Sequence, residues 1–384
     1  MDSPYRNSLK AAIHAVKIAA SIAQAVQTAT LKSSSSSSSS PSSSSKYESI
    51  IKDDLSPVTV ADFAIQTVLT KLLLSAFPDD SFVGEESAAE LRADPKLLAC
   101  VHGVISASDS EGAQMMTPEE DVCTLIDLCG NGTPGDYDSG RVWIFDPIDG
   151  TKAFLRGEQY AINLALLEGG RQVLSVVGLP LLSPHLNPSR DTVVTDTSVD
   201  PSGEGCIVFA VRGYGAYSRP LFTPSQNDEE MIVPKRLPRH ADAVQVDKLR
   251  NVTCWNHLDS GIDTAHQAVA ANLGMAETFP GCDLLGWVPR WAVLALGHAN
   301  MTVWVYKTRE RHGKIWDHAG AMLLFEEVGG QITDIDGREI DLTAGRTLKG
   351  NCGFVAAPRS VHHVVLKAVR DTLRQQGKGG LLLR

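Results

Sequence analysis

The chain reads Trp143-Ile144-Phe145-Asp146-Pro147-Ile148-Asp149-Gly150-Thr151-Lys152 at the point where a predicted strand meets a predicted turn. Residues 142–145 are apolar and predict a buried strand that carries Asp146 at its end. Pro147 fixes its own φ, so the carboxylates of Asp146 and Asp149 are held near one locus. Crowded carboxylates repel each other unless a hard cation lies between them, and oxygen ligands of this kind suit Mg²⁺.

Gly150 and Thr151 follow the second carboxylate and lead toward a predicted helix. Backbone N–H groups at the start of such a helix would face an anion such as phosphate. The alternative is a capped turn with two exposed acids, which is the commoner meaning of an isolated pair of aspartates at this spacing. The functional interpretation therefore depends on the other acidic positions of the chain.

Three further acidic positions stand beside predicted structural elements. Glu85 follows Gly84 after a short predicted strand, and a glycine before paired acids lets the backbone approach a ligand closely. Asp62 and Asp317 each begin a predicted helix. N-capping of those helices is the alternative role for both side chains.

Taken in order along the chain, these positions resemble the inositol-monophosphatase superfamily of lithium-sensitive, Mg²⁺-dependent phosphomonoesterases. The resemblance rests on four motifs, which are Asp62, Gly84-Glu85-Glu86, Asp146-Pro147-Ile148-Asp149-Gly150-Thr151 and Trp316-Asp317. It covers residues 56–358, which is most of the chain. It implies an α/β fold of the inositol-monophosphatase and fructose-1,6-bisphosphatase type, a five-layer αβαβα sandwich.

The resemblance also implies a site for two or three Mg²⁺ ions. Glu85, Asp146 and the carbonyl of Ile148 would hold one ion, and Asp146, Asp149 and Asp317 would hold a second. Two ions about 3.5–4 Å apart can stabilise both the attacking and the leaving oxygen of an in-line displacement.

Catalytic and substrate-binding roles follow from the same resemblance. Asp62, hydrogen-bonded to Thr151, would orient and deprotonate the attacking water. Gly150, Thr151 and Asp317 would contact the phosphorylated substrate. No covalent phosphoenzyme is required.

Within the superfamily, several segments resemble the branch of 3′(2′),5′-bisphosphate nucleotidases, which convert adenosine 3′,5′-bisphosphate to AMP in sulfur assimilation. These segments are residues 56–59, residues 153–159 after the Asp-Gly-Thr-Lys turn, residues 210–216, and the long stretch between Glu86 and Trp143. In that branch a His, a Ser, a Lys and an Arg grip the nucleotide. His257 falls near the expected His, and Arg290 stands in place of the Lys.

Two positions of the expected pocket depart from that branch. Trp287 lies near the place of the Ser, and Trp304 aligns with the Arg, which Arg309 or Arg311 could replace if the register differs. Arg and Lys also differ at a phosphate site. Two alternatives therefore stay open: an inositol-phosphate or other sugar-phosphate phosphatase with the same metal site, and a catalytically silent paralogue that binds phosphorylated ligands.

Bulk properties limit the partners. The 384 residues carry a formal net charge of −10, which disfavours nucleic acid and anionic membranes as partners. Seven cysteines without a C-x-x-C pair indicate free thiols in a reducing compartment, and the start of the chain shows no signal-peptide pattern. We expect a cytoplasmic monomer, with a mitochondrial presequence as a minor option.

The predicted organisation has two halves. An N-terminal α+β domain at residues 1–185 carries most metal ligands, and a C-terminal α/β domain at residues 186–384 carries Asp317 and the residues that grip the substrate. Residues 32–46 form a serine tract that cannot bury apolar surface and is predicted to be disordered. The polar, turn-rich residues 88–140 predict a surface insertion.

Overall fold

The computed structural model describes most of the 384 residues. The described residues are 3–35, 57–108, 119–130, 132, 134, 140–188, 192–223, 232–240, 244–255, 261, 265–275 and 281–383. The predicted serine tract from residue 36 onward lies outside them, and so does His257.

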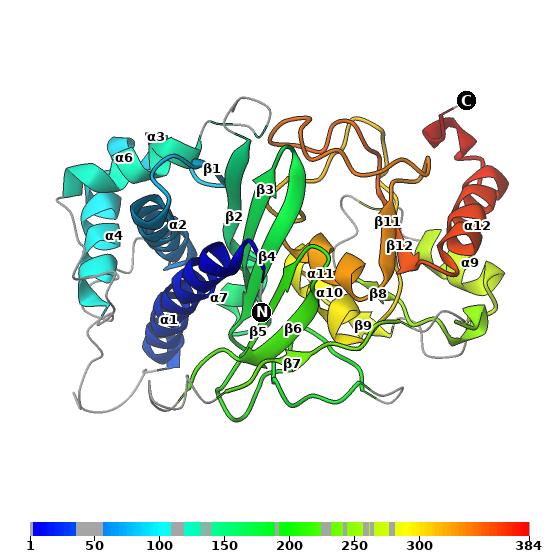
Figure 1. Cartoon of the computed structure of the whole chain (residues 1–384), viewed down its shortest axis with the longest axis horizontal. Coiled ribbons are helices and arrows are strands. Elements are labelled where there is room, and N and C mark those ends of the chain that lie inside the picture. Colours follow the sequence, from blue (N-terminus) through cyan, green and yellow to red (C-terminus); the bar gives the residue numbers. More distant parts are fainter. Residues whose placement is uncertain are drawn as a thin grey trace.

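The described chain forms five layers, alternately of helices and of sheet (Figure 1). The helical layers are α1 (Arg6–Ser35) with α2 (Pro57–Ala76), then α10 (Trp287–Leu296) with α11 (Ala321–Glu327), then α9 (Ala265–Asn272) with α12 (His362–Gln375). Three clusters of buried apolar side chains fill the spaces between the layers. This arrangement confirms the predicted five-layer αβαβα sandwich.

The larger sheet has seven strands in sequence order. They are β1 (Ser81–Gly84), β2 (Arg141–Asp149), β3 (Ala161–Glu168), β4 (Arg171–Leu179), β5 (Cys206–Val211), β6 (Gly215–Pro220) and β7 (Lys235–Arg236). Only the β1–β2 pair among them is parallel, and β3 and β4 form the predicted hairpin. Since β5, β6 and β7 extend the same sheet beyond residue 185, a division of the chain there stays a prediction.

Two smaller sheets lie in the C-terminal half. One has the order β10-β12-β11 and the other pairs β8 with β9. Their strands are β8 (Val252–Thr253), β9 (Cys282–Asp283), β10 (Thr302–Trp304), β11 (Gly330–Thr333) and β12 (Phe354–Pro358). Short 3-10 turns at Val246–Lys248 and Gly379–Leu381 complete the described elements of this half.

Helix α1 is long and apolar enough to cross a membrane by length and composition. Its alanines and branched residues, such as Val16, Ile22 and Val26, are buried in the first core cluster with the side chains of α2. The opposite face carries Lys10 and other polar residues. An amphipathic core helix passes the same test, and that is the role this helix has in the fold.

Helices in the segment predicted to be a surface insertion pack against the core. It contains α3 (Ala89–Ala93), α4 (Pro95–Ala107) and α6 (Glu119–Gly130). Val101 and Val104 of α4 and Val122 and Ile126 of α6 are fully buried in the cluster that also contains α2. One face of α4 and one face of α6 are therefore buried, and the description of residues 88–140 as a surface insertion stays a prediction.

Candidate active site

A β-bulge explains how two aspartates three residues apart reach one site. In a regular strand, side chains at odd spacing point to opposite faces of the sheet. Asp146 pairs with Asn163 and Asp149 with Ala161, so the register shifts by one residue between them. Ile148 accordingly packs toward α1 and α2, and both carboxylates point toward α10 and α11. The Pro147-Ile148 step thus places both acids on the same face.

Asp149 is fixed by the start of α10. Its Oδ2 accepts a 2.7 Å hydrogen bond from the backbone N–H of Val288, in a helix whose N-cap residue Gly286 offers no side chain. A Cβ at Gly286 would lie 2.5 Å from that oxygen. The sequence therefore needs glycine there so that the carboxylate can approach the helix terminus.

Glu85 is held through the backbone around it. The Gln66 side chain donates to the carbonyl of Glu86 and accepts from its N–H, both at 2.9 Å. The Arg346 guanidinium donates to the carbonyls of Gly84 and Glu85 from the far end of the chain. The backbone at Gly84 lies so close to the Gln66 side chain that a Cβ there would be 2.6 Å from Gln66 Oε1, so this position also requires glycine.

Asp317 reaches the site from a loop that packs on β3. Asn163 donates from its side-chain amide to the carbonyl of Trp316, the residue before it. Gly320 lies so close to Asn163 that a Cβ would contact its Oδ1. The loop before α11 is therefore anchored beside Asp146, whose β2 position pairs with Asn163.

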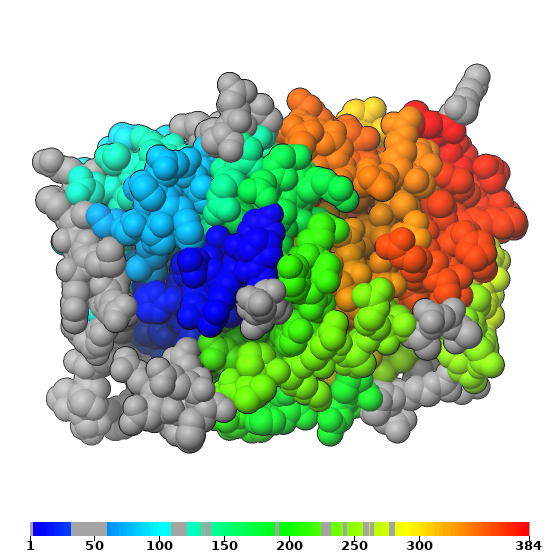
Figure 2. Space-filling model, viewed as in Figure 1, coloured from blue at the N-terminus to red at the C-terminus, as the bar shows by residue number. Residues whose placement is uncertain are grey.

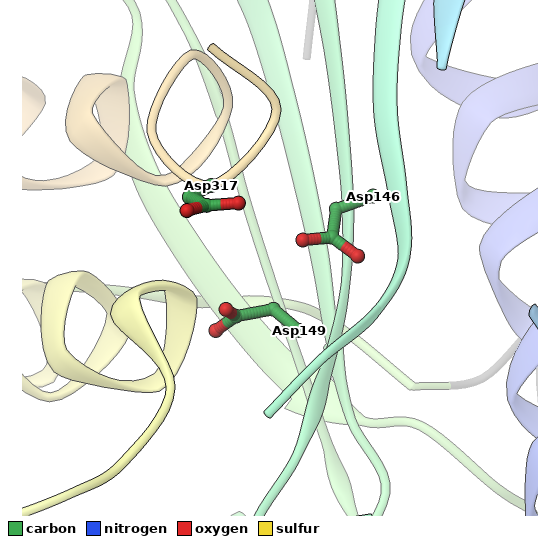
Figure 3. A group of neighbouring side chains, drawn as sticks. All are labelled: Asp146, Asp149 and Asp317. Carbon is green, nitrogen blue, oxygen red and sulfur yellow. The ribbon is translucent and has the colours of Figure 1, made fainter. Parts of the chain in front are cut away.

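Asp146, Asp149 and Asp317 meet at one point. Each offers a carboxylate oxygen within 4.8 Å of the others, and Figure 3 shows the three side chains converging from β2 and from the loop before α11. Burial raises the pKa of Asp146 well above its ordinary value, and the charges of Glu85, Asp149 and Asp317 raise it further. Burial also raises the pKa of Asp149 to about 7, although the Val288 hydrogen bond opposes this shift.

This arrangement fits a bound metal cation. Oδ1 of Asp146 is buried and accepts no hydrogen bond from the described residues. A buried acceptor of this kind needs another partner, and a cation can supply it. Mutual repulsion of the carboxylates is relieved when a divalent cation binds between them. Oxygen-only donors of this kind suit Mg²⁺ rather than softer metals.

The predicted hydrogen bond between Asp62 and Thr151 is absent from the described residues. The Thr151 hydroxyl donates to the carbonyl of Ile148 at 3.3 Å, and Oδ1 of Asp62 is buried without a partner. Burial raises the pKa of Asp62, and the charges of Glu86 and Glu85 raise it further. Asp62 therefore belongs to the same electrostatic cluster, but its orientation toward Thr151 stays a prediction.

A pocket of about 290 Å³ adjoins the carboxylates. It is lined by Asp149, Gly150, Thr151, Lys152, Leu285, Gly286, Trp287, Arg290, Trp304, Arg311 and Asp317. The pocket thus brings together five of the predicted site residues. They are Asp149, Asp317, Gly150, Thr151 and Arg290. Glycine at position 150 has φ +94°, a left-handed conformation that starts the short helix α7 (Thr151–Leu155).

Arg290 forms the inner wall of this pocket. Its guanidinium is buried and donates to the carbonyls of Leu284 and Leu285 at 2.8 and 2.7 Å, and one terminal nitrogen has no partner among the described residues. It lies 4.2 Å from the ring centre of Trp287 and 4.9 Å from that of Trp304. The two tryptophans therefore hold the cation by cation–π contact.

The structure distinguishes the two candidate arginines that sequence left open. Arg311 lines the pocket, whereas Arg309 pairs with Asp336 at 2.9 Å and donates to the carbonyl of Leu381. Sequence reasoning did not single out Lys152 as a pocket residue, nor Gln66 and Arg346 as supports of Glu85. Lys152 follows the Asp-Gly-Thr turn directly, which is the signal that could have found it. Arg346 lies 261 residues from Glu85, and no local pattern marks it.

Comparison with known proteins places this site in context. A family model described as the inositol monophosphatase family matches residues 6–374. A 3′(2′),5′-bisphosphate nucleotidase from Emericella nidulans is 33% identical over 341 residues, covering 85% of this chain and 91% of the relative. Another from Schizosaccharomyces pombe is 32% identical over 325 residues, covering 83% and 85%. The solved structure of an inositol monophosphatase from Zymomonas mobilis shares the fold, with a TM-score of 0.55 and 17% identity over 96% of this chain and 99% of that one.

Proposed function

Because the chain belongs to the inositol monophosphatase family, we propose that it hydrolyses the 3′-phosphate of adenosine 3′,5′-bisphosphate, giving AMP and phosphate with Mg²⁺ as cofactor. The observation that carries the proposal is the convergence of Asp146, Asp149 and Asp317 beside a pocket whose other wall is cationic and aromatic. The relatives named as bisphosphate nucleotidases support the choice of substrate.

Asp146, Asp149 and Asp317 would hold the metal, with Glu85 and the carbonyl of Ile148 completing the donor set. When bound, Mg²⁺ neutralises charge on the phosphoryl oxygens and makes the attacking water more acidic. Asp62 orients that water and accepts its proton. Val288 and Gln66 act indirectly, because they fix Asp149 and the Glu85 backbone before substrate arrives.

Three cations of the pocket fit the second phosphate of the substrate. Lys152 and Arg311 are exposed at the mouth, and Arg290 offers its unpartnered nitrogen from the wall. The indole of Trp287 supplies an aromatic surface on which a base can stack. A monophosphate of an uncharged polyol would use the carboxylates but not this cationic wall.

The burial of Arg290 also supports a second candidate, an inositol-phosphate or sugar-phosphate phosphatase. Two of its donors are already bonded to backbone carbonyls, which leaves less of the guanidinium for a second phosphate. The shared chemistry of both candidates is metal-dependent removal of phosphate from an alcohol.

Phosphate release from adenosine 3′,5′-bisphosphate tests the proposal. We expect turnover in Mg²⁺, none in excess EDTA, and inhibition by millimolar LiCl as in the lithium-sensitive members of the superfamily. Binding of the nucleotide without turnover in Mg²⁺ would support the silent paralogue instead. Hydrolysis that persists in EDTA would contradict the assigned metal site.

A further inference from the structure

A large cavity of the described chain lies away from the carboxylate site. Its volume is about 1030 Å³, and none of its lining residues lines the active-site pocket. It is formed by the turn before β4, by β7 and the residues after it, by the end of α11, and by β11 with the loop that follows. In Figure 2 the green atoms of the seven-stranded sheet meet the orange atoms of the C-terminal half along this boundary.

Five arginines from separate parts of the chain line this cavity. They are Arg171, Arg212, Arg236, Arg239 and Arg359. Such a concentration is notable in a protein whose formal net charge is −10. The lining also holds four acids, Glu326, Glu327, Glu339 and Asp341, so its formal net charge is +1 and what the cavity can bind depends on which donors and acceptors are already bonded.

Most acids of the cavity are already engaged. Glu326 pairs with Arg212 at 3.0 Å. Glu327 accepts 2.8 Å hydrogen bonds from the backbone N–H groups of Gly213 and Gly215. Asp341 accepts from the backbone and hydroxyl of Thr343. Of the lining acids, only Glu339 has no side-chain partner among the described residues.

Four of the arginines, by contrast, keep free donors. Arg171, Arg236 and Arg359 have no side-chain hydrogen bond or ion pair within the described part of the chain, and Arg239 has one 3.3 Å bond to the carbonyl of Glu327. The guanidinium is a fork of donors that matches phosphate and sulfate oxygens. More guanidinium donors are therefore offered to the cavity than its own acids accept.

The framework around these side chains is fixed. The turn at Gly170 touches Thr343, since a Cβ on the glycine would lie 2.6 Å from its methyl group. Glu327 ties the β5–β6 turn to α11. Within the described part of the chain β11 is an edge strand, so the side turned away from β12 adds backbone groups without strand partners to the wall.

We propose that this cavity is a second binding site, for a small polyanion that carries two or more phosphate or sulfate groups. Its volume is at the upper end of the range for small-molecule pockets, and one charged group would engage only part of the arginine set. The site is independent of the proposed catalytic reaction, because the two pockets share no lining residue.

Calorimetric titration with inorganic tripolyphosphate in EDTA tests this proposal, because without a cation the carboxylate cluster repels the probe. We compare the double variant Arg236→Ala/Arg359→Ala with the matched double variant Lys152→Ala/Arg311→Ala, which removes the same charge from the active-site pocket. We expect one equivalent to bind the wild type, and binding at least about tenfold weaker in the first variant but unchanged in the second.

A second variant acts in the opposite direction. Glu339→Gln removes the one unengaged acid of the cavity, so it should tighten binding of tripolyphosphate by a few fold. Equal affinity in both double variants would overturn the proposal, and so would the absence of binding at millimolar probe. Loss of binding only in the Lys152→Ala/Arg311→Ala variant would place the anion in the active site and would also overturn it.

Discussion

The carboxylate cluster and the wall of the substrate pocket lie on two sides of Asp149, yet different interactions determine what each of them can bind. In the cluster, three aspartates within 4.8 Å of one another leave a cation as the natural partner, whatever the substrate. In the wall, Arg290 lies between Trp287 and Trp304 and divides its donors between backbone and pocket. We expect the crowded aspartates to determine the reaction, because they create the need for a bound cation. We expect the arginines and tryptophans of the wall to determine which phosphate ester binds.

The largest expected effect lies in the cluster. Asp146→Asn removes a carboxylate whose pKa is raised by burial and by four other acids, Glu85, Asp149, Asp317 and Asp62, so the bound metal would lose a proposed ligand. We expect kcat/KM to fall at least about 10³-fold, or about 4 kcal/mol, in Mg²⁺. A thermal melt of the metal-free variant checks that it is folded. Near-normal turnover would show that the cluster does not do the chemistry.

Gly286→Ala tests the connection between the two regions. The new Cβ would lie 2.5 Å from Asp149 Oδ2 and would displace the carboxylate from the start of α10. We expect roughly a 10²-fold loss of kcat/KM from misplacement alone. Gly380→Ala is the matched control, because nothing lies within 4 Å of its Cβ, and it should behave as wild type. Full activity of Gly286→Ala would mean that Asp149 does not need this position.

Arg311→Ala sharpens the distinction between the regions. Loss of a cation at the pocket mouth should lower kcat/KM for adenosine 3′,5′-bisphosphate about tenfold. Hydrolysis of p-nitrophenyl phosphate, which has no second phosphate, should change less than about threefold. The nearby Arg309→Ala serves as control, since Arg309 pairs with Asp336 outside the pocket. Equal losses on both substrates would assign Arg311 to the metal site rather than to the wall.

The smallest effect concerns stability and pH. Burial raises the folded-state pKa of Asp149 and of Glu86 to about 7, so the folded protein binds more protons than the unfolded chain between about pH 4 and pH 7. The metal-free protein should therefore lose stability as pH rises through this window. Melting temperatures in EDTA at pH 5.5 and pH 8 measure this, and Mg²⁺ should raise the value more at pH 8.

Glu86→Gln is the matched variant for that measurement. It removes a titrating carboxyl beside Asp62 and Glu85 without removing a proposed metal ligand. We expect its metal-free melting temperature to fall less between pH 5.5 and pH 8 than that of the wild type. A melting temperature in EDTA that rises from pH 5.5 to pH 8 would contradict the raised pKa values.

The resemblance to the inositol-monophosphatase superfamily implied the five-layer fold and the acidic cluster, whereas local sequence patterns predicted individual elements. The β3–β4 hairpin and a buried strand carrying Asp146 depend on a few neighbouring residues, and both predictions are confirmed. The prediction that Asp62 begins a helix was wrong, because Asp62 lies inside α2 (Pro57–Ala76), and Asp317 lies in the loop before α11 (Ala321–Glu327) rather than at the start of that helix. Between Asp146 and Asp149 the sequence predicted a turn, whereas strand β2 continues to Asp149 with a bulge between the two acids. Residue patterns within one segment predict single strands, helices and turns without knowledge of tertiary contacts.

The supporting contacts could not be predicted in the same way. Arg346 reaches Glu85 across 261 residues, and Arg290 is buried by tryptophans from two separate elements. The burial of one face of the helices at 95–107 and 119–130 was not predicted, because polar turns flank them. Which of Arg309 and Arg311 enters the pocket depends on a loop path that residue spacing does not fix.

The most direct measurement is phosphate release, with Mg²⁺, from adenosine 3′,5′-bisphosphate and inositol 1-phosphate side by side. Both esters would place the phosphate that is removed at the carboxylate cluster. A difference between their rates would therefore come from the wall formed by Trp287, Arg290 and Arg311. We predict a preference of about 100-fold for the nucleotide, or about 2.7 kcal/mol of transition-state discrimination. Equal rates, or a preference for the inositol ester, would contradict the assignment of this pocket to a bisphosphate nucleotide.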